Sequence, residues 1–229
     1  MNRFIIINSV LTILLFATSC SLLTGSSDEP ELRFEEEQYI VDGEVRKAYR
    51  SLDVISVRLI ADTNVDEFNS YIDSLGLQPV TSFYHSPYSA ISESQVQRKA
   101  LIVFLLPSNA DRSQFFSFSD NLSEDSFAKN SFIEYSLPAY SSDPVNTSWY
   151  YPDNIIALLP LSEDFSETEL ADQFNLELHS YLNLNELHMY AFSDHQFLHG
   201  SPYELAGAIY ESGDYKYVVP NSYRHVSLF

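Results

Sequence analysis

The order of predicted elements in the C-terminal third of the 229-residue chain constrains the fold more than any other feature. Short β-rich apolar runs alternate there with segments of helical period, and each predicted helix begins at a capping box. The two capping boxes are Ser166–Glu169 and Ser201–Glu204, the second with proline at the first helical position. The predicted strands span residues 154–159, 177–182, 187–192 and 215–219. The order is therefore strand, helix, strand, strand, helix, strand.

A looser copy of the same order precedes this region. Its predicted strands span residues 54–60, 78–84, 100–106 and 132–137, and its predicted helices span 64–75 and, more weakly, 111–122. A βαββαβ order with short connections is typical of the ferredoxin-like fold, in which two helices cover one face of a four-stranded antiparallel sheet. We therefore expect an α+β protein of two tandem ferredoxin-like domains. Each would leave one sheet face that a partner, the sister domain or polar side chains must cover.

The N-terminal segment indicates export. Arg3 precedes an apolar run from Phe4 to Phe16, and small residues then lead to Cys20, a pattern typical of a signal peptide. The run is shorter than the ~20 residues that a membrane-spanning helix needs. The site resembles the lipobox of bacterial lipoproteins, with Ala17 where leucine is usual. This resemblance implies a lipid on Cys20 and a membrane-anchored lipoprotein of the cell envelope, at the outer membrane. The alternative is secretion, with Cys20 an incidental thiol.

Composition and pattern together divide the chain into five segments. We expect a signal peptide (1–19), an acidic tether (20–45), a degenerate first domain (46–140), a linker (141–152) and a second domain with a C-terminal tail (153–229). Because Cys20 is the only cysteine, the folded part must be stabilised by its apolar core and not by internal disulfides.

Acidic residues far outnumber basic ones. The chain has 32 Asp and Glu against 12 Lys and Arg, which gives a formal net charge of −20. Binding to nucleic acid requires clustered Lys and Arg that neutralise phosphates, so the sequence excludes nucleic acid as a partner. The charge indicates either simple solubility and self-repulsion of an exported protein or a partner protein that is basic.

The second copy also resembles a known family. The segment Glu204–Gly213, followed by Tyr217 and by Pro220–Asn221, is similar to the end of the N-terminal prodomain of bacterial subtilisin-like serine proteases. Asp153–Leu158 resembles the first strand of that prodomain, and the likeness is weaker over residues 53–140. The chain departs from the family pattern at Gly207, Val218 and Val219.

Such prodomains assist the folding of their protease, pack an open sheet face on it and place their C-terminal tail in its active site. The resemblance therefore implies a non-catalytic envelope lipoprotein that binds a subtilisin-like protease and inhibits it or assists its folding. The candidate partner-binding residues of the tail are Tyr223, Val226, Leu228 and Phe229. The alternative for the tail is a frayed terminus. The alternative for the protein is a surface interaction or scaffold lipoprotein that keeps the fold without binding a protease.

The sequence predicts no enzyme, no cofactor and no metal site. The signatures that surround the catalytic residues of subtilases are missing from the sequence, as are a nucleophile elbow and a glycine-rich phosphate loop. His195 and His199 have the spacing of a zinc pair on a helix, but Gly200–Pro202 place them in a loop, and no Glu lies between them as a general base. A Ser–His–Asp triad is recognised by geometry, so the sequence alone leaves it open.

Overall fold

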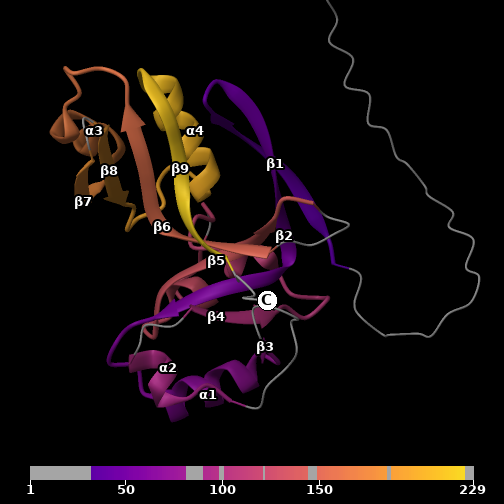
Figure 1. Cartoon of the computed structure of the whole chain (residues 1–229). Helices are drawn as coiled ribbons and strands as arrows, with labels where there is room; N and C mark the ends of the chain where they lie inside the picture. Colours follow the sequence, from indigo (N-terminus) through magenta and orange to yellow (C-terminus); the bar gives the residue numbers. More distant parts are fainter. Residues whose placement is uncertain are drawn as a thin grey trace, which may run out of the picture. The chain divides into compact units, whose positions relative to one another are not determined.

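The computed structural model describes residues 32–80, 90–97, 101–120, 122–143, 149–184 and 187–224 (Figure 1). Within them the strands are β1 (Phe34–Val41), β2 (Glu44–Leu59), β3 (Gln78–Val80), β4 (Leu101–Leu105), β5 (Ile133–Ser141), β6 (Trp149–Pro160), β7 (Glu177–Leu184), β8 (Leu187–Ser193) and β9 (Tyr215–Arg224). The α-helices are α1 (Val65–Ser74), α2 (Glu93–Gln97), α3 (Glu167–Phe174) and α4 (Pro202–Ser212), and two 3-10 turns are η1 (Arg112–Gln114) and η2 (Phe127–Lys129).

All nine of these strands join one antiparallel sheet. Its order is β3-β4-β2-β1-β9-β6-β8-β7, and β5 pairs with both β2 and β6. The 16 residues of β2 make this possible, because its first half pairs with β1 and its second half pairs with β4. Strand β5 runs along the other side of β2 and continues into β6 through the pair Tyr140↔Tyr150.

Five of the strands pair in a closed circuit, from β1 through β2, β5, β6 and β9 back to β1. The last link is short, since Val41 pairs with Tyr217 and the Asp42 N–H donates to the Lys216 carbonyl at 3.1 Å. The prediction of two tandem ferredoxin-like domains is therefore wrong. Two separate sheets would each leave strand edges with unpaired N–H and C=O groups. In the structure, strands from the two predicted domains pair with each other across the predicted boundary. The result is a sheet-dominated fold, and Leu32–Phe229 group into one compact unit.

Three predicted segments also differ from the structure. The weak helix predicted over 111–122 is irregular chain that contains only the turn η1. The predicted acidic tether, 20–45, contains β1 and the start of β2, while its residues 20–31 lie outside the described part of the chain. The predicted linker, 141–152, contains the end of β5 and the start of β6, and 144–148 lie outside the described part.

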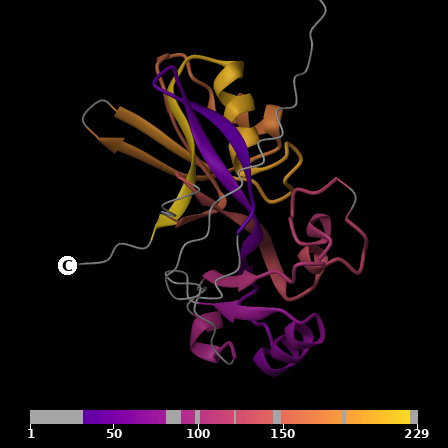
Figure 2. The same ribbon diagram turned by 90° about the vertical axis from the view of Figure 1, so that its right-hand side faces the viewer.

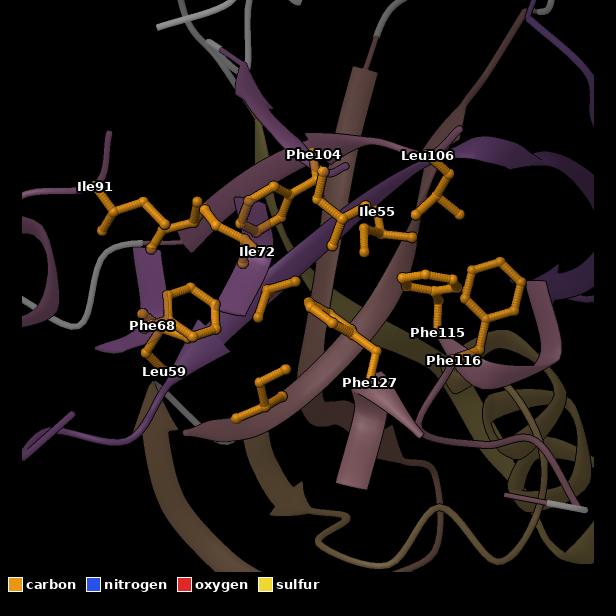
Figure 3. Close-up of a cluster of buried hydrophobic side chains, with 14 of the residues drawn as sticks. Ile55, Leu59, Phe68, Ile72, Ile91, Phe104, Leu106, Phe115, Phe116 and Phe127 are labelled. Carbon is orange, nitrogen blue, oxygen red and sulfur yellow. The ribbon is translucent and has the colours of Figure 1, made fainter. Parts of the chain in front are cut away.

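The first apolar core lies between the sheet and α1. Figure 3 shows Phe68 and Ile72 of α1 among Ile55 and Phe104 of the sheet, with the ring of Phe127 beside them. The ring centroids of Phe104 and Phe127 are 6.3 Å apart at 80°, an edge-to-face contact. Phenylalanine rings from the irregular chain thus fill the space that a second helix was expected to fill.

The second apolar core lies under α3 and α4, which begin where the sequence predicts. At α4 the capping box is complete, because Ser201 Oγ accepts from the Glu204 N–H at 3.2 Å and the Glu204 carboxylate accepts from the Ser201 N–H at 2.6 Å. At α3 the Ser166 hydroxyl accepts from the Glu169 N–H at 3.2 Å. These caps fix both helix starts against the same sheet face.

Candidate functional site

The strands β9, β6, β8 and β7 carry helices on one face only. On that face Ile156, Leu158 and Phe192 are buried against Leu170 of α3 and Ile209 of α4. Figure 2 shows α3 and α4 on the same side of these strands, and no described helix lies on the other side. This second face is called the open face below.

Small side chains cross the middle of the open face. The registers Ser180↔Ala191, Ala191↔Ala157 and Ala157↔Val219 align these four residues across β7, β8, β6 and β9. They alternate with the residues that face the helices, so they point to the opposite side of the sheet. Ala191, Ala157 and Val219 are partly exposed and belong to none of the buried clusters. The open face is therefore apolar at its centre and presents no bulky side chain there.

Strand β7 forms the outer edge of this part of the sheet. Only β8 pairs with it among the described residues, and the β7–β8 hairpin projects away from its neighbours (Figure 2). Leu178, Tyr181 and Leu182 are 42%, 47% and 49% exposed. Since an edge strand directs unpaired N–H and C=O groups outward, β7 offers backbone partners together with apolar side chains.

The opposite edge of the sheet has a different character. Strand β3 has only three residues, and its central residue is Pro79, which has no N–H to donate. A short edge strand that contains proline resists pairing with another chain. Of the two strands that end the sheet order, β7 is therefore the one suited to accept a further strand.

Charge is distributed unevenly over the fold. No Lys or Arg occurs from Asn130 to Tyr215, a stretch that contains 14 Asp and Glu residues. In β1 and β2, by contrast, cations pair with acids, as in the contact of 2.8 Å between Lys47 Nζ and Glu36 Oε2. Most of the open face and the whole β7 edge therefore lie on a stretch of chain without Lys or Arg, and the cation that acts on Asp153 of this stretch is Arg58 of β2.

The sequence predicts a strand over residues 177–182, within β7, but no site on it. Two signals in the sequence mark it. The strand Glu177–Leu184 contains neither proline nor lysine, the residues that usually protect an edge, and it lies within the stretch without Lys or Arg. That β7 is an edge at all depends on the sheet order, which the sequence does not state.

A buried carboxylate lies where β1 meets α4. Glu37 Oε2 accepts hydrogen bonds from the Tyr140 hydroxyl at 3.1 Å and from Ser201 Oγ at 3.0 Å, and Glu37 Oε1 lies 2.7 Å from Arg50 Nη1. Burial raises the pKa of Glu37, an effect that the charge of Arg50 partly offsets. The ring of Tyr140 also packs on Tyr203, with centroids 4.7 Å apart. This cluster ties together the two regions that were predicted as separate domains.

A cavity of about 690 Å³ adjoins this cluster. Its lining includes Arg50, Phe118, Asp120, His199 and Glu204. The Arg50 guanidinium already pairs with two glutamates of β1 and lies over the Phe118 ring at 5.6 Å. The Arg50 charge is therefore neutralised by glutamates of the same protein and is not available to a ligand in the cavity. For this reason the cavity is a poorer candidate site than the open face.

The predicted C-terminal tail begins inside the sheet. Tyr223 pairs with Tyr151 of β6, and its hydroxyl accepts a hydrogen bond of 2.9 Å from Arg58 Nη2. The Arg58 guanidinium also lies over the Tyr223 ring at 5.7 Å. Tyr223 is thus held by β2 and β6, whereas a free tail was expected there. The other predicted site residues lie outside the described residues, namely Cys20, Val226, Leu228 and Phe229.

The two histidines with metal-like spacing have separate contacts. His195 Nε2 lies 3.4 Å from Glu177 Oε2, whereas the His199 ring packs edge-on against Phe174 with centroids 5.3 Å apart. Within the described ranges, no group of three or more His, Cys, Asp and Glu residues is arranged to hold a metal ion.

Two motif residues of the segment that resembles the prodomain meet in space. Asn221 Nδ2 donates to Asp153 Oδ2 at 2.6 Å, and Asp153 Oδ1 accepts from the Ile155 N–H at 2.9 Å. Burial raises the pKa of Asp153, and these hydrogen bonds lower it. The Asp153–Asn221 contact joins the start of the segment to its end, which is a structural role.

Comparison with known proteins gave no match to a family model, to a curated protein or to a solved structure. The resemblance to subtilase prodomains therefore depends on the motifs described above. Among the helices of the described residues, none has the length and apolar character needed to span a membrane.

Proposed function

We propose that this chain is a non-catalytic binding protein that holds a partner protein against its open face. The observation that carries the proposal is the apolar row of Ala191, Ala157 and Val219, which has helices behind it and none in front among the described residues. An apolar face of this kind favours contact with another protein, because its burial removes apolar surface from water.

The partner that we propose is a subtilisin-like serine protease. The motif Glu204–Gly213 supports this choice through its resemblance to the end of those prodomains, and the Asp153–Asn221 contact joins the start and the end of the segment that carries the resemblance. The small residues at the centre of the open face suit contact with a protruding partner element, such as a surface helix. Since Tyr223 is held in the sheet, insertion of the tail into a protease cleft would start beyond Arg224.

Protease assays test this proposal. The full chain is mixed with envelope and secreted subtilases, and peptide hydrolysis and recovery of activity after refolding are measured. We expect inhibition or improved refolding at micromolar protein, and we expect Ala191→Arg to abolish either effect because a long charged side chain would stand on the open face. Gln173→Arg, on the exposed side of α3, adds the same charge elsewhere and is the matched control. No effect of the full chain on any subtilase would remove the protease as the partner.

We further propose that the protein is anchored in the cell envelope through a lipid on Cys20, with secretion as the alternative. The pattern of residues 1–20 supports the proposal. Mass spectrometry of the mature N-terminus tests it directly, because lipidation adds acyl groups to Cys20 and moves the protein into the detergent phase. A Cys20→Ser variant that keeps the same membrane fraction would contradict the anchor.

A further inference from the structure

The edge strand β7 is long and is supported by β8 on one side. Its pairing with β8 runs from Glu177↔Ser193 to Leu184↔Leu187, with one irregularity between Leu178 and Ser180. Eight residues of strand span roughly 26 Å, which suffices for a stable ladder with another chain. The outer edge has no partner in the described part of the chain.

Aromatic contacts fix the conformation of this edge. The ring centroids of Tyr181 and of Tyr190 on β8 are 5.0 Å apart. The ring of Tyr190 also packs on Phe165, just before α3, with centroids 4.7 Å apart. The Tyr181 hydroxyl also contacts His188 Nδ1 at 2.5 Å. Because the strand is already ordered, an added strand would not have to order β7, which lowers the cost of binding.

Acidic side chains surround the same edge. Glu177 is the first residue of β7, and α3, which contacts β7, carries Glu167, Glu169 and Asp172, all exposed. Lys216 of β9 lines a hollow together with His188 and Tyr190 of β8, so one cation lies near the hairpin. The four acids outnumber it and give the edge a net negative field. This field attracts a basic strand and repels a second copy of the same acidic chain.

We infer that the outer edge of β7 binds an extended, basic segment of a partner polypeptide, which adds to the sheet as a tenth strand beside β7. Backbone hydrogen bonds supply affinity for any extended chain, while Leu178, Tyr181 and Leu182 select apolar residues and the surrounding acids select Lys and Arg between them. This surface differs from the open face, so the inference does not depend on the proposed protease partner.

Binding of two designed peptides to the full chain tests the inference. One peptide of about nine residues alternates Lys with Val, and its match has Glu in place of every Lys. We expect the basic peptide to bind at low salt and the acidic peptide to bind at least about tenfold more weakly. Raising the salt from about 50 mM to about 500 mM should weaken the basic peptide, because the Debye length falls well below the size of the site. Equal binding of the two peptides would overturn the inference.

Two variants and one exchange measurement place the peptide. Leu182→Lys puts a charge on the edge and should weaken binding at least about tenfold, whereas Val45→Lys, at a residue of β2 that is 62% exposed, should not. Circular dichroism confirms that both variants fold. In the wild-type complex, amide exchange should slow within Glu177–Leu184. Equal weakening by both variants, or no slowing in β7, would refute strand addition. Concentration-dependent self-association that Leu182→Lys abolishes would assign the edge to a second copy instead.

Discussion

The buried contact between Tyr140 and Glu37 should contribute measurably to stability. The Tyr140 side chain is fully buried, and its hydroxyl donates to a carboxylate that is largely buried as well. A hydrogen bond to a charged group contributes about 1.5–3 kcal/mol, so Tyr140→Phe should lower the free energy of unfolding by about 2 kcal/mol. The aromatic contacts with Tyr150 and Tyr203 remain in this variant, so packing contributes little to the loss.

Urea unfolding followed by circular dichroism at pH 7 measures this loss. With a slope of about 2 kcal/mol per molar, the midpoint should fall by about 1 M. Tyr39→Phe is the matched control, because Tyr39 belongs to the same aromatic cluster and its hydroxyl makes no hydrogen bond within the described residues. We expect Tyr140→Phe to add less to Glu37→Gln than it costs alone, since the two residues share one bond. A loss below about 0.5 kcal/mol, or full additivity with Glu37→Gln, would refute the importance of this bond.

Three further outcomes are expected. Burial raises the pKa of Glu37 above its ordinary value of 4.5, so the folded state keeps the carboxyl proton to higher pH than the unfolded chain does. The free energy of unfolding should therefore fall as the pH rises from the unfolded to the folded pKa of Glu37. Urea titrations at several pH values should show that Glu37→Gln removes this part of the pH dependence. Arg58→Met removes hydrogen bonds to Tyr135 and Tyr223, which should cost about 2 kcal/mol and speed amide exchange at the end of β9. Unchanged exchange there would show that Arg58 does not hold Tyr223 in the sheet. Gly43→Ala places a Cβ at φ +74° in the β1–β2 turn and should cost about 1 kcal/mol by thermal unfolding, whereas a neutral result would show that the turn relaxes.

The predicted starts of α3 and α4 are confirmed, because the capping signals that predict them are local in the sequence. Ser166 and Ser201 each cap a helix start through one side-chain hydrogen bond to a residue three positions later. The weak helix predicted over 111–122 had no such signal at its start beyond Asp111, and its phenylalanines instead pack into the first core. In residues 111–122 the helical pattern was weak, and tertiary packing of the phenylalanines decided the structure.

The strand β1 was missed because its acids were interpreted as a tether. Residues 34–41 contain three consecutive glutamates, Glu35 to Glu37, and the basic residues that compensate them lie on β2, where Arg50 pairs with Glu35 at 2.5 Å. The turn Asp42–Gly43, with positive φ at both residues, was the available sign of a hairpin. The continuity of the sheet is harder to predict, since the pairs Tyr140↔Tyr150 and Val41↔Tyr217 depend on long-range contacts that no local pattern encodes.

The single sheet changes how the charge of this protein should be interpreted. Cations concentrate in β2, where Arg46, Lys47 and Arg50 pair with glutamates of the β1–β2 hairpin, so this hairpin is close to internally neutralised. The stretch from Asn130 to Tyr215 has no Lys or Arg, yet it contains most of the open face and all of the β7 edge. Acidity spread over the whole surface serves solubility, whereas 14 acids without Lys or Arg on the stretch that contains the unpaired edge also oppose pairing between copies. A basic partner reverses that repulsion, so the same residues would discourage self-association and select the strand that binds.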